Sequence, residues 1–483
     1  MLKFISRYGT AAHLALVAVA PLFLFPFCSA TTMGHVLLWL ASGTMAWVVL
    51  EPSRRQGEAL HDARVRVMRN IVKDPLLWFL LAVVLFAGLR AFNGGIDKVF
   101  DLELGDWRVA ESIWPNFPGC ATGAGYLPFA MVFALMVVVM ACRHSLGKSA
   151  RISFLFATSF LAGLSGILAA FMCSFENPVL RAATEESFLN PTYWGSAFGV
   201  YYLVSFVAFV GGFDRKWNRL FMLFVFGMGG TATGLFFFAP MAVVLTYVIA
   251  GFLVMLCAFL FAGVYMGVSV PMKALAGFLM ALVIPVLLVL GCAPDGMVAS
   301  RGALFTGGTL LPEGFSEVRG LLNDLSIKVL KGNLWIGTGL GTMGLNIRFN
   351  LNEADWSVVS PQQIALANGW LQFLVERGVV GMLIFVSGAC LMLYTYIRRM
   401  IASFGKVYFK PAAWLGLAVL IVAVFETCWD NSLLNPAMFL AVSSIFAVSA
   451  SSFPTLPTKS IESNEKDSEK VEEPSNKELA KTI

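Results

Sequence analysis

The chain has 483 residues, of which 58% are hydrophobic and 13% are charged, and its mean hydropathy is +0.77. Soluble globular domains are far less apolar, so these values exclude a soluble enzyme and indicate a protein that crosses a membrane several times. The net charge of +5 does not point to nucleic acid, because the basic residues are concentrated in short segments between apolar runs.

The apolar runs predict about twelve transmembrane helices, because a span needs roughly twenty mostly apolar residues. We expect them near residues 11–31, 33–50, 75–93, 126–142, 152–172, 193–212, 220–236, 240–266, 272–292, 378–397, 411–428 and 435–452. The count depends on the stretch "TATGLFFFAPMAVVLTY", which is either a turn between two spans or one kinked helix. The expected fold is therefore an all-α bundle, with helices one to nine in residues 1–292 and helices ten to twelve in residues 378–452.

Lys and Arg in the short loops predict which side of the membrane each loop occupies. With twelve spans, the basic loops 51–74, 143–151, 213–219 and 398–410 all fall on one side, which the positive-inside rule makes cytoplasmic. Both termini share that side. The first apolar run has no small-residue cleavage site and leads into a second span, so it is predicted to be an anchor rather than a signal peptide. The tail 453–483 has mixed charge and few apolar residues, and we expect it to be disordered.

The outer side then holds a large periplasmic loop, residues 293–377, between the ninth and tenth helices. Segments 94–125 and 173–192 lie on the same side. Cys120, Cys173 and Cys292 are placed there as well, although one sequence does not say whether any two form a disulfide.

The few charges in the spans lie near their outer ends. These residues are Arg90, Glu376, Arg377 and Glu426. Transporters carry ionisable groups near the middle of the bilayer, so this distribution favours a site that acts on a substrate held at the outer leaflet. Gly-rich stretches such as "FGMGGTATG" leave a broken-helix transporter open as the alternative.

The segment "FSEVRGLLNDLSIKVLKGNLWIGTGLGTMG", residues 315–344, has apolar residues at helical spacing followed by a Gly-rich turn. It predicts an amphipathic helix that lies on the membrane surface and ends at Gly332. The run "GTGLG" does not follow a strand, so it is not a dinucleotide-binding motif. Gly337, Gly339 and Gly341 are expected to permit a tight backbone.

This helix, the segment "NLWIGTGLGTMG" and the later "ANGWLQFLVERGVVG" follow one another in an order that resembles the O-antigen ligase and polymerase superfamily over residues 317–381. Members are bacterial inner-membrane glycosyltransferases with about twelve spans and a large periplasmic loop. The resemblance implies inverting transfer of a glycan from an undecaprenyl-pyrophosphate donor to another glycan, or to the lipid A core, without a metal or other cofactor. The partners implied are this donor, the acceptor and the lipid bilayer, with no nucleic acid.

Two positions depart from the family pattern. Ala367 precedes Asn368 where the family has His-Asn, and Gly234 stands where relatives often have an arginine. The missing His leaves three explanations: a polymerase or divergent enzyme that uses another group, a His-to-Ala variant, or an inactive relative. It places a polymerase slightly ahead of a ligase. A transporter and a non-catalytic glycan-assembly protein remain alternatives.

The candidate catalytic residues are Glu376, as a base with a pKa raised by desolvation at the membrane interface, and Asn368, which matches the family's Asn. The structural alternatives are that Glu376 pairs with Arg377 and that Asn368 forms a turn. For the substrate, arginine suits a pyrophosphate because its planar fork donates two parallel hydrogen bonds. The candidate substrate-binding residues are Arg319, which matches the family's arginine, Arg301 and Arg348, which have no motif support, and Trp335 and Trp370, which either stack on sugars or anchor the chain at the interface.

Overall fold

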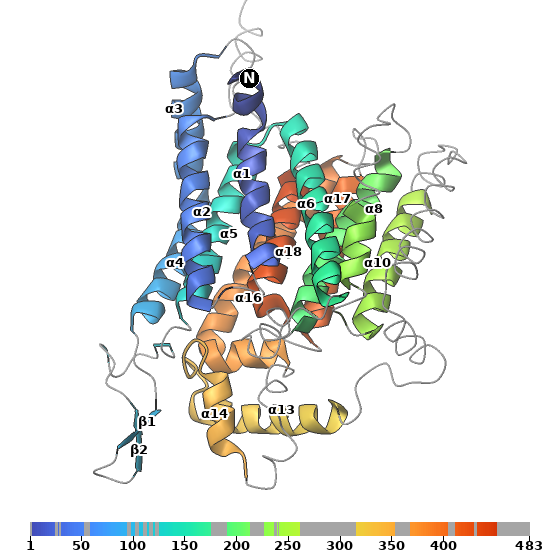
Figure 1. The fold of residues 1–483 in the computed structure, drawn as a ribbon. Helices are drawn as coiled ribbons and strands as arrows, with labels where there is room; N and C mark the ends of the chain where they lie inside the picture. Colours follow the sequence, from blue (N-terminus) through green and yellow to red (C-terminus); the bar gives the residue numbers. More distant parts are fainter. Residues whose placement is uncertain are drawn as a thin grey trace, which may run out of the picture.

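The computed structural model describes part of the chain. These residues are 2–24, 28, 30–52, 58–93, 98–101, 106–109, 114, 119–120, 125–174, 191–212, 227–235, 239, 241–260, 315–352, 368–403, 411–428 and 432–451. Within them the protein is predominantly helical (Figure 1).

The helices of the bundle are α1 (Leu2–Leu24), α2 (Ala30–Leu50), α4 (Pro75–Phe92), α5 (Tyr126–His144), α6 (Lys148–Ser174), α8 (Pro191–Gly212), α10 (Met241–Leu260), α16 (Gly369–Ser403), α17 (Pro411–Thr427) and α18 (Pro436–Ser451). The connecting segments contain α3 (Leu60–Val72), α13 (Phe315–Gly332), α14 (Met343–Asn350) and the 3-10 helix η3 (Ser432–Leu434). Two short strands, β1 (Lys98–Asp101) and β2 (Asp106–Val109), pair antiparallel.

Five helices within the described residues are long and apolar enough to cross a membrane. These are Thr31–Leu50, Pro75–Phe92, Tyr126–His144, Ala150–Ala169 and Gly369–Arg398. Shorter apolar helices cover Gly9–Leu24, Gly195–Phe206, Val243–Leu253, Leu415–Thr427 and Pro436–Ser451. Length and composition thus indicate a membrane protein, and ten of the twelve predicted spans overlap one of the helices of the bundle. The predicted span 272–292 lies outside the described residues, so the count of twelve stays a prediction.

Helices α5 and α18 form the centre of the bundle. Helix α5 packs against α2, α4 and α18, and α18 also packs against α1, α8 and α17. Close approach elsewhere depends on glycine: a Cβ on Gly230 would lie 2.1 Å from the carbonyl oxygen of Gly163 in α6. Residues 227–235 are helical, Ala239 lies in a bend and α10 begins at Met241, so the stretch "TATGLFFFAPMAVVLTY" is not one continuous helix.

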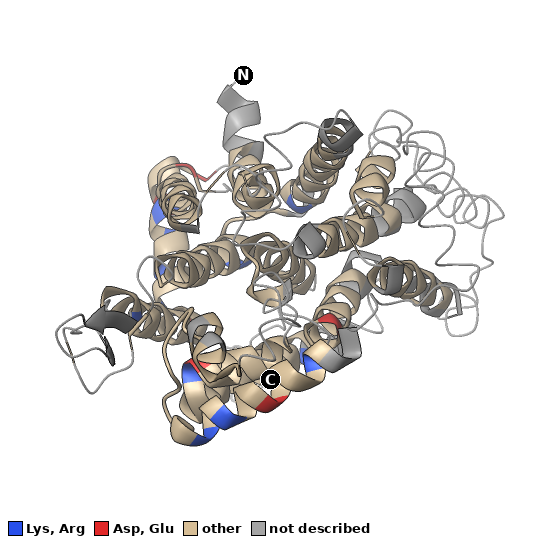
Figure 2. Ribbon diagram, turned by 60° about the horizontal axis from the view of Figure 1, so that its bottom comes forward, with Lys and Arg blue, Asp and Glu red and all other residues tan. Residues whose placement is uncertain are grey.

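The two ends of the bundle differ. Helix α3 lies at one end, and α13 and α14 lie across the other, which we name the α13 end (Figure 1). The predicted amphipathic helix is confirmed as α13, which ends at Gly332 and buries Val318, Leu322 and Leu325. Figure 2 shows charged residues gathered on the helices at the α13 end.

Three features were not predicted from sequence. Helix α3 lies in the segment 51–74, which was predicted to be a loop because the three arginines of the helix obscured its apolar spacing. The β1–β2 hairpin departs from the all-α prediction, and its strands of four residues are too short to give a clear alternating pattern. Helix α16 begins at Gly369, nine residues before the predicted span, so the segment 293–377 contains its first two turns.

Cys120 is a buried free thiol whose Sγ lies 3.2 Å from the carbonyl oxygen of Ala91.

Candidate functional site

Helix α16 is broken at Gly378, where the backbone adopts φ 69° and ψ −177°. Such a break leaves carbonyl groups before it and N–H groups after it without partners in the helix. The loop 333–342 supplies those partners. The N–H groups of Thr338 and Gly339 donate to the carbonyls of Val375 (2.8 Å) and Glu376 (3.1 Å), and those of Val379 and Val380 donate to the carbonyls of Leu334 (2.9 Å) and Trp335 (3.1 Å). The loop and the helix break therefore form one hydrogen-bonded unit, which is what irregular backbone within a membrane bundle requires.

Glycine is necessary on both sides of this contact. Gly337 has a φ of +78°, and a Cβ there would lie 2.6 Å from the carbonyl oxygen of Glu376. A Cβ on Gly378 would lie 2.4 Å from the carbonyl oxygen of Trp335. Gly339 and Gly341 also have positive φ angles, so the prediction that the "GTGLG" run serves a tight backbone is confirmed.

Arg90, near the end of α4, fastens this unit to the bundle. Its side chain is 1% exposed, and one terminal nitrogen donates to the carbonyls of Ile336 (3.2 Å) and Glu376 (3.0 Å). The guanidinium also lies 5.6 Å from the ring centre of Phe86. A buried arginine needs partners, and here backbone carbonyls provide them.

Glu376 lies at the same break and is 4% exposed. Its carboxylate accepts hydrogen bonds from the Gln372 side chain at 3.1 Å and from the backbone N–H of Gly341. An Arg377 nitrogen lies 3.9 Å from it, and the Arg377 guanidinium lies 4.2 Å from the ring centre of Phe373. These contacts agree with the structural alternative for Glu376: it lies beside Arg377 and joins the broken helix to the loop at Gly341.

A second buried carboxylate occupies the last turn of α17. Glu426 is 4% exposed, and it accepts a hydrogen bond of 2.6 Å from the hydroxyl of Tyr247 and another from the hydroxyl of Ser196. The three residues come from α17, α10 and α8. An ionisable group inside an apolar bundle is costly, so it marks a candidate functional position.

Two of the predicted substrate-binding residues contact the same turn of α17. Arg319 donates from α13 to the carbonyl of Cys428, and the indole N–H of Trp370 donates to the carbonyl of Val424 at 3.3 Å. Carbonyl groups at a helix C-terminus carry partial negative charge, which favours a cation there. Arg319, Trp370 and Glu426 thus gather around one helix end.

Asn368 caps the first half of α16. Its side-chain oxygen accepts the N–H groups of Trp370 (2.9 Å) and Leu371 (3.3 Å), as expected of an N-cap residue. Trp335 is 68% exposed, so its ring is free to meet lipid or sugar. Arg301, Ala367 and the side chain of Arg348 lie outside the described residues.

Gly234 packs directly against the ring of Phe198. A Cβ at this position would lie 2.7 Å from the ring of Phe198, so no larger residue fits without a shift of that ring. An aromatic ring therefore occupies the space that a side chain at position 234 would fill.

Sequence reasoning did not assign Tyr247, Ser196 or Glu426 to a site. Glu426 was recognisable as the one acidic residue of the predicted span 411–428, but its partners come from helices about 180 to 230 residues earlier. A tyrosine and a serine in apolar helices carry no sequence signal of their own. Among the residues that the structure describes, no three His, Cys, Asp or Glu side chains lie close enough to hold a metal ion.

Comparison with known proteins does not assign a family. No protein-family model matches the chain, and no curated protein matches it significantly. The function is therefore inferred from the sequence and from the contacts at the α13 end.

Proposed function

We propose that the chain is a membrane glycosyltransferase of the O-antigen ligase and polymerase type. It transfers a glycan from an undecaprenyl-pyrophosphate donor to a sugar hydroxyl on the periplasmic side of the bacterial inner membrane. The observation that supports this most is that Arg319, on an amphipathic helix across the bundle end, contacts the turn of α17 that carries the buried Glu426. Arg319, a cation suited to a pyrophosphate, is thus bonded to a backbone carbonyl two residues after Glu426, a carboxylate suited to accept a proton.

The reaction requires one bond to form and one to break. The acceptor hydroxyl oxygen bonds to the anomeric carbon of the donor from the side opposite the pyrophosphate. The bond from that carbon to the pyrophosphate oxygen breaks, and the configuration at the carbon inverts. The hydroxyl proton passes to a carboxylate, and the lipid pyrophosphate leaves with the electron pair. Arg319 stabilises the charge that develops on the leaving group, which is the role in which a positioned cation accelerates a reaction most.

Glu426 is better suited than Glu376 to accept the proton. The hydroxyls of Ser196 and Tyr247 donate hydrogen bonds to its carboxylate, and a hydroxyl can itself relay a proton. Glu376 instead contacts the backbone and an arginine at the helix break, and loss of its charge would weaken those contacts. We therefore assign the base to Glu426 and a positioning role to Glu376 and Asn368.

The remaining predicted residues belong to the substrate path of this proposal. Trp335 is exposed enough to stack on a sugar ring, and Trp370 is held beside α17 by its indole N–H. Arg301 and Arg348 are further candidate contacts for the pyrophosphate.

The test is a transfer assay in proteoliposomes with an undecaprenyl-pyrophosphate-linked repeat unit, with and without lipid A core, for the chain as it stands and for Ala367→His. Longer glycans from the unaltered chain would identify a polymerase that needs no His at this position. Core-linked product only after the substitution would identify a disabled ligase. Absence of any product from either protein would contradict the proposal.

A transporter of lipid-linked glycans or small solutes is the second candidate, and the break in α16 favours it. Broken helices line the substrate sites of many transporters, because the freed backbone groups contact the solute. Here the freed groups of Val375, Glu376, Val379 and Val380 are bonded to the loop 333–342 instead. Movement of a labelled donor across the vesicle membrane without a new glycosidic bond would support the transporter over the transferase.

A further inference from the structure

Helix α3 connects two candidate membrane spans and is therefore placed at the membrane boundary. Helix α2 ends at Leu50 before α3, and only Lys73 and Asp74 separate the last residue of α3, Val72, from the first residue of α4, Pro75. With its 13 residues, α3 is too short to span and must lie at the end of the bundle.

The helix presents two apolar stripes instead of one. Ala63, Val67 and Ile71 are buried against the bundle. Val65, Met68 and Val72 recur at the spacing of one helix face and are 41%, 37% and 49% exposed. Ordinary surface helices bury their only apolar stripe, so the second stripe indicates an apolar environment outside the protein.

Trp78, in the first turn of α4, continues this exposed apolar surface. Its side chain is 56% exposed, and its indole N–H donates to the carbonyl of Val72 at 3.0 Å. Tryptophan with an apolar ring outward and a bonded N–H is typical of the boundary between lipid tails and headgroups.

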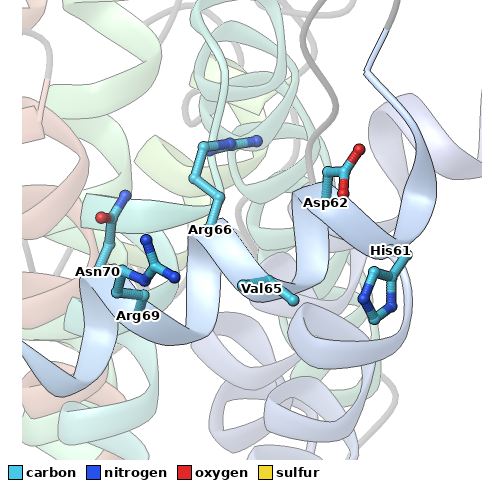
Figure 3. A pocket seen from close by; sticks show the side chains of 6 residues that line it. All are labelled: His61, Asp62, Val65, Arg66, Arg69 and Asn70. Carbon is cyan, nitrogen blue, oxygen red and sulfur yellow. The ribbon is translucent and has the colours of Figure 1, made fainter.

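A polar hollow runs beside the exposed stripe (Figure 3). It is lined by His61, Asp62, Val65, Arg66, Arg69 and Asn70. Arg66 is already paired with Glu58 at 2.7 Å, and Arg64, on the same helix, donates to the carbonyl of Leu50.

Arg69 in α3 and Lys73, which follows its last residue, are exposed cations, and neither side chain has a hydrogen bond or ion pair within the described part of the chain. The acidic groups nearby are Asp62, on the same helix, and Asp74. Asp74 is paired with Arg143 at 2.7 Å and with His144 at 2.8 Å, so its charge is compensated. The surface thus combines an apolar stripe with two uncompensated cations, which matches the boundary between acyl chains and phosphate groups.

We propose that α3 binds anionic phospholipid headgroups, with Val65, Met68 and Val72 among the acyl chains and Arg69 and Lys73 on the phosphates. The net positive charge selects anionic over zwitterionic lipid, because each cation near the membrane surface raises the affinity for anionic lipid about fivefold. This inference does not depend on the proposed glycan transfer.

The first test places a photo-crosslinking phenylalanine analogue at Met68 of the full-length protein in vesicles of phosphatidylglycerol or of phosphatidylcholine. The matched control has the analogue at Asn70, on the polar side of the same helix. We expect lipid adducts at position 68 well in excess of those at position 70. Equal yields at the two positions, or a protein adduct at position 68, would overturn the proposal.

The second test measures phosphatidylglycerol retained by the delipidated protein in native mass spectrometry. Arg69→Gln with Lys73→Gln should weaken its binding about 30-fold, whereas Lys328→Gln with Lys331→Gln on α13 should leave the α3 component unchanged. Equal retention by both double variants would overturn the role of the two cations. An equal loss for phosphatidylcholine would overturn the selection of anionic lipid.

Discussion

At the α3 end of the bundle the charged side chains bind partners that are close in the chain or on the next helix. At the α13 end Arg90, Arg319 and Glu426 bind groups that lie more than 100 residues away in the chain. Arg66 pairs with Glu58, eight residues earlier, and Asp74 pairs with the end of α5. Arg90, in contrast, bonds to carbonyls that lie 246 and 286 residues further along the chain. These contacts of the α3 end stay within residues 50–144, whereas these contacts of the α13 end join segments more than 100 residues apart.

The difference in partners carries a difference in energy. Surface ion pairs contribute about 0–1 kcal/mol each. Removing one partner of a buried charged group costs about 3–5 kcal/mol, because the other is left uncompensated. Changes at the α13 end should therefore have larger effects than changes to a partly exposed pair of the α3 end, such as Arg66 with Glu58. The buried Asp74 is the exception at the α3 end, and its effect should approach those at the α13 end.

The largest effect is expected for the buried carboxylate Glu426. Glu426→Gln removes the proton acceptor while keeping the size of the side chain, and the transfer rate should fall about 10²–10⁴-fold. Glu376→Gln should keep most of the rate and lower the thermal midpoint of unfolding, because its contacts hold the loop to α16. An unchanged transfer rate for Glu426→Gln, together with a large loss of transfer rate for Glu376→Gln, would identify Glu376 as the base instead.

Local patterns in the sequence were sufficient for part of this end and insufficient for the rest. The amphipathic spacing from Val318 to Leu325 and the run "GTGLG" predicted α13 and the tight turn after it, because both depend on neighbouring residues. The break at Gly378 was not predicted, because "ERGVVG" continues into an apolar run and gives no signal of an interrupted helix. The partners of Arg90 and Glu426 were not predictable either, since their contacts join segments that only the packed bundle brings together.

A somewhat smaller loss is expected for Arg319. Arg319→Ala should lower the transfer rate about a hundredfold, because a positioned charge on the leaving group contributes roughly 3 kcal/mol. The yield of folded protein in the membrane should stay the same. Lys328→Ala is the matched control, since Lys328 is an exposed cation on the same helix. Equal rates for the two variants would contradict a donor-binding role for Arg319.

Gly378→Ala tests whether the α13 end depends on the helix break. The substitution strains a backbone with φ 69° and brings a Cβ to 2.4 Å from the Trp335 carbonyl oxygen, so we expect a loss of about 2–3 kcal/mol in the free energy of unfolding. Gly320→Ala is the control, because a Cβ there meets nothing within 4 Å. The measurement is unfolding of the purified protein in detergent, and equal stability of both variants would show that the loop does not require the break.

The smallest effect is expected at the α3 end, for Asp74. Burial opposes its ionisation, but the His144 hydrogen bond and the charge of Arg143 hold its pKa at about 2, below the ordinary value of 3.8. The ionised carboxylate therefore stabilises the folded state above about pH 4, and this contribution is lost as the pH falls toward 2. Asp74→Asn should cost about 1–3 kcal/mol at neutral pH, and its thermal midpoint should approach that of the unaltered protein between pH 4 and 2. Asp62→Asn, on the exposed face of α3, should change stability by less than about 0.5 kcal/mol. Equal stability of Asp74→Asn and Asp62→Asn at every pH would show that the ion pair of Asp74 does not stabilise the packing of α3, α4 and α5. The contrast between the two ends of the bundle would then have no support at the α3 end.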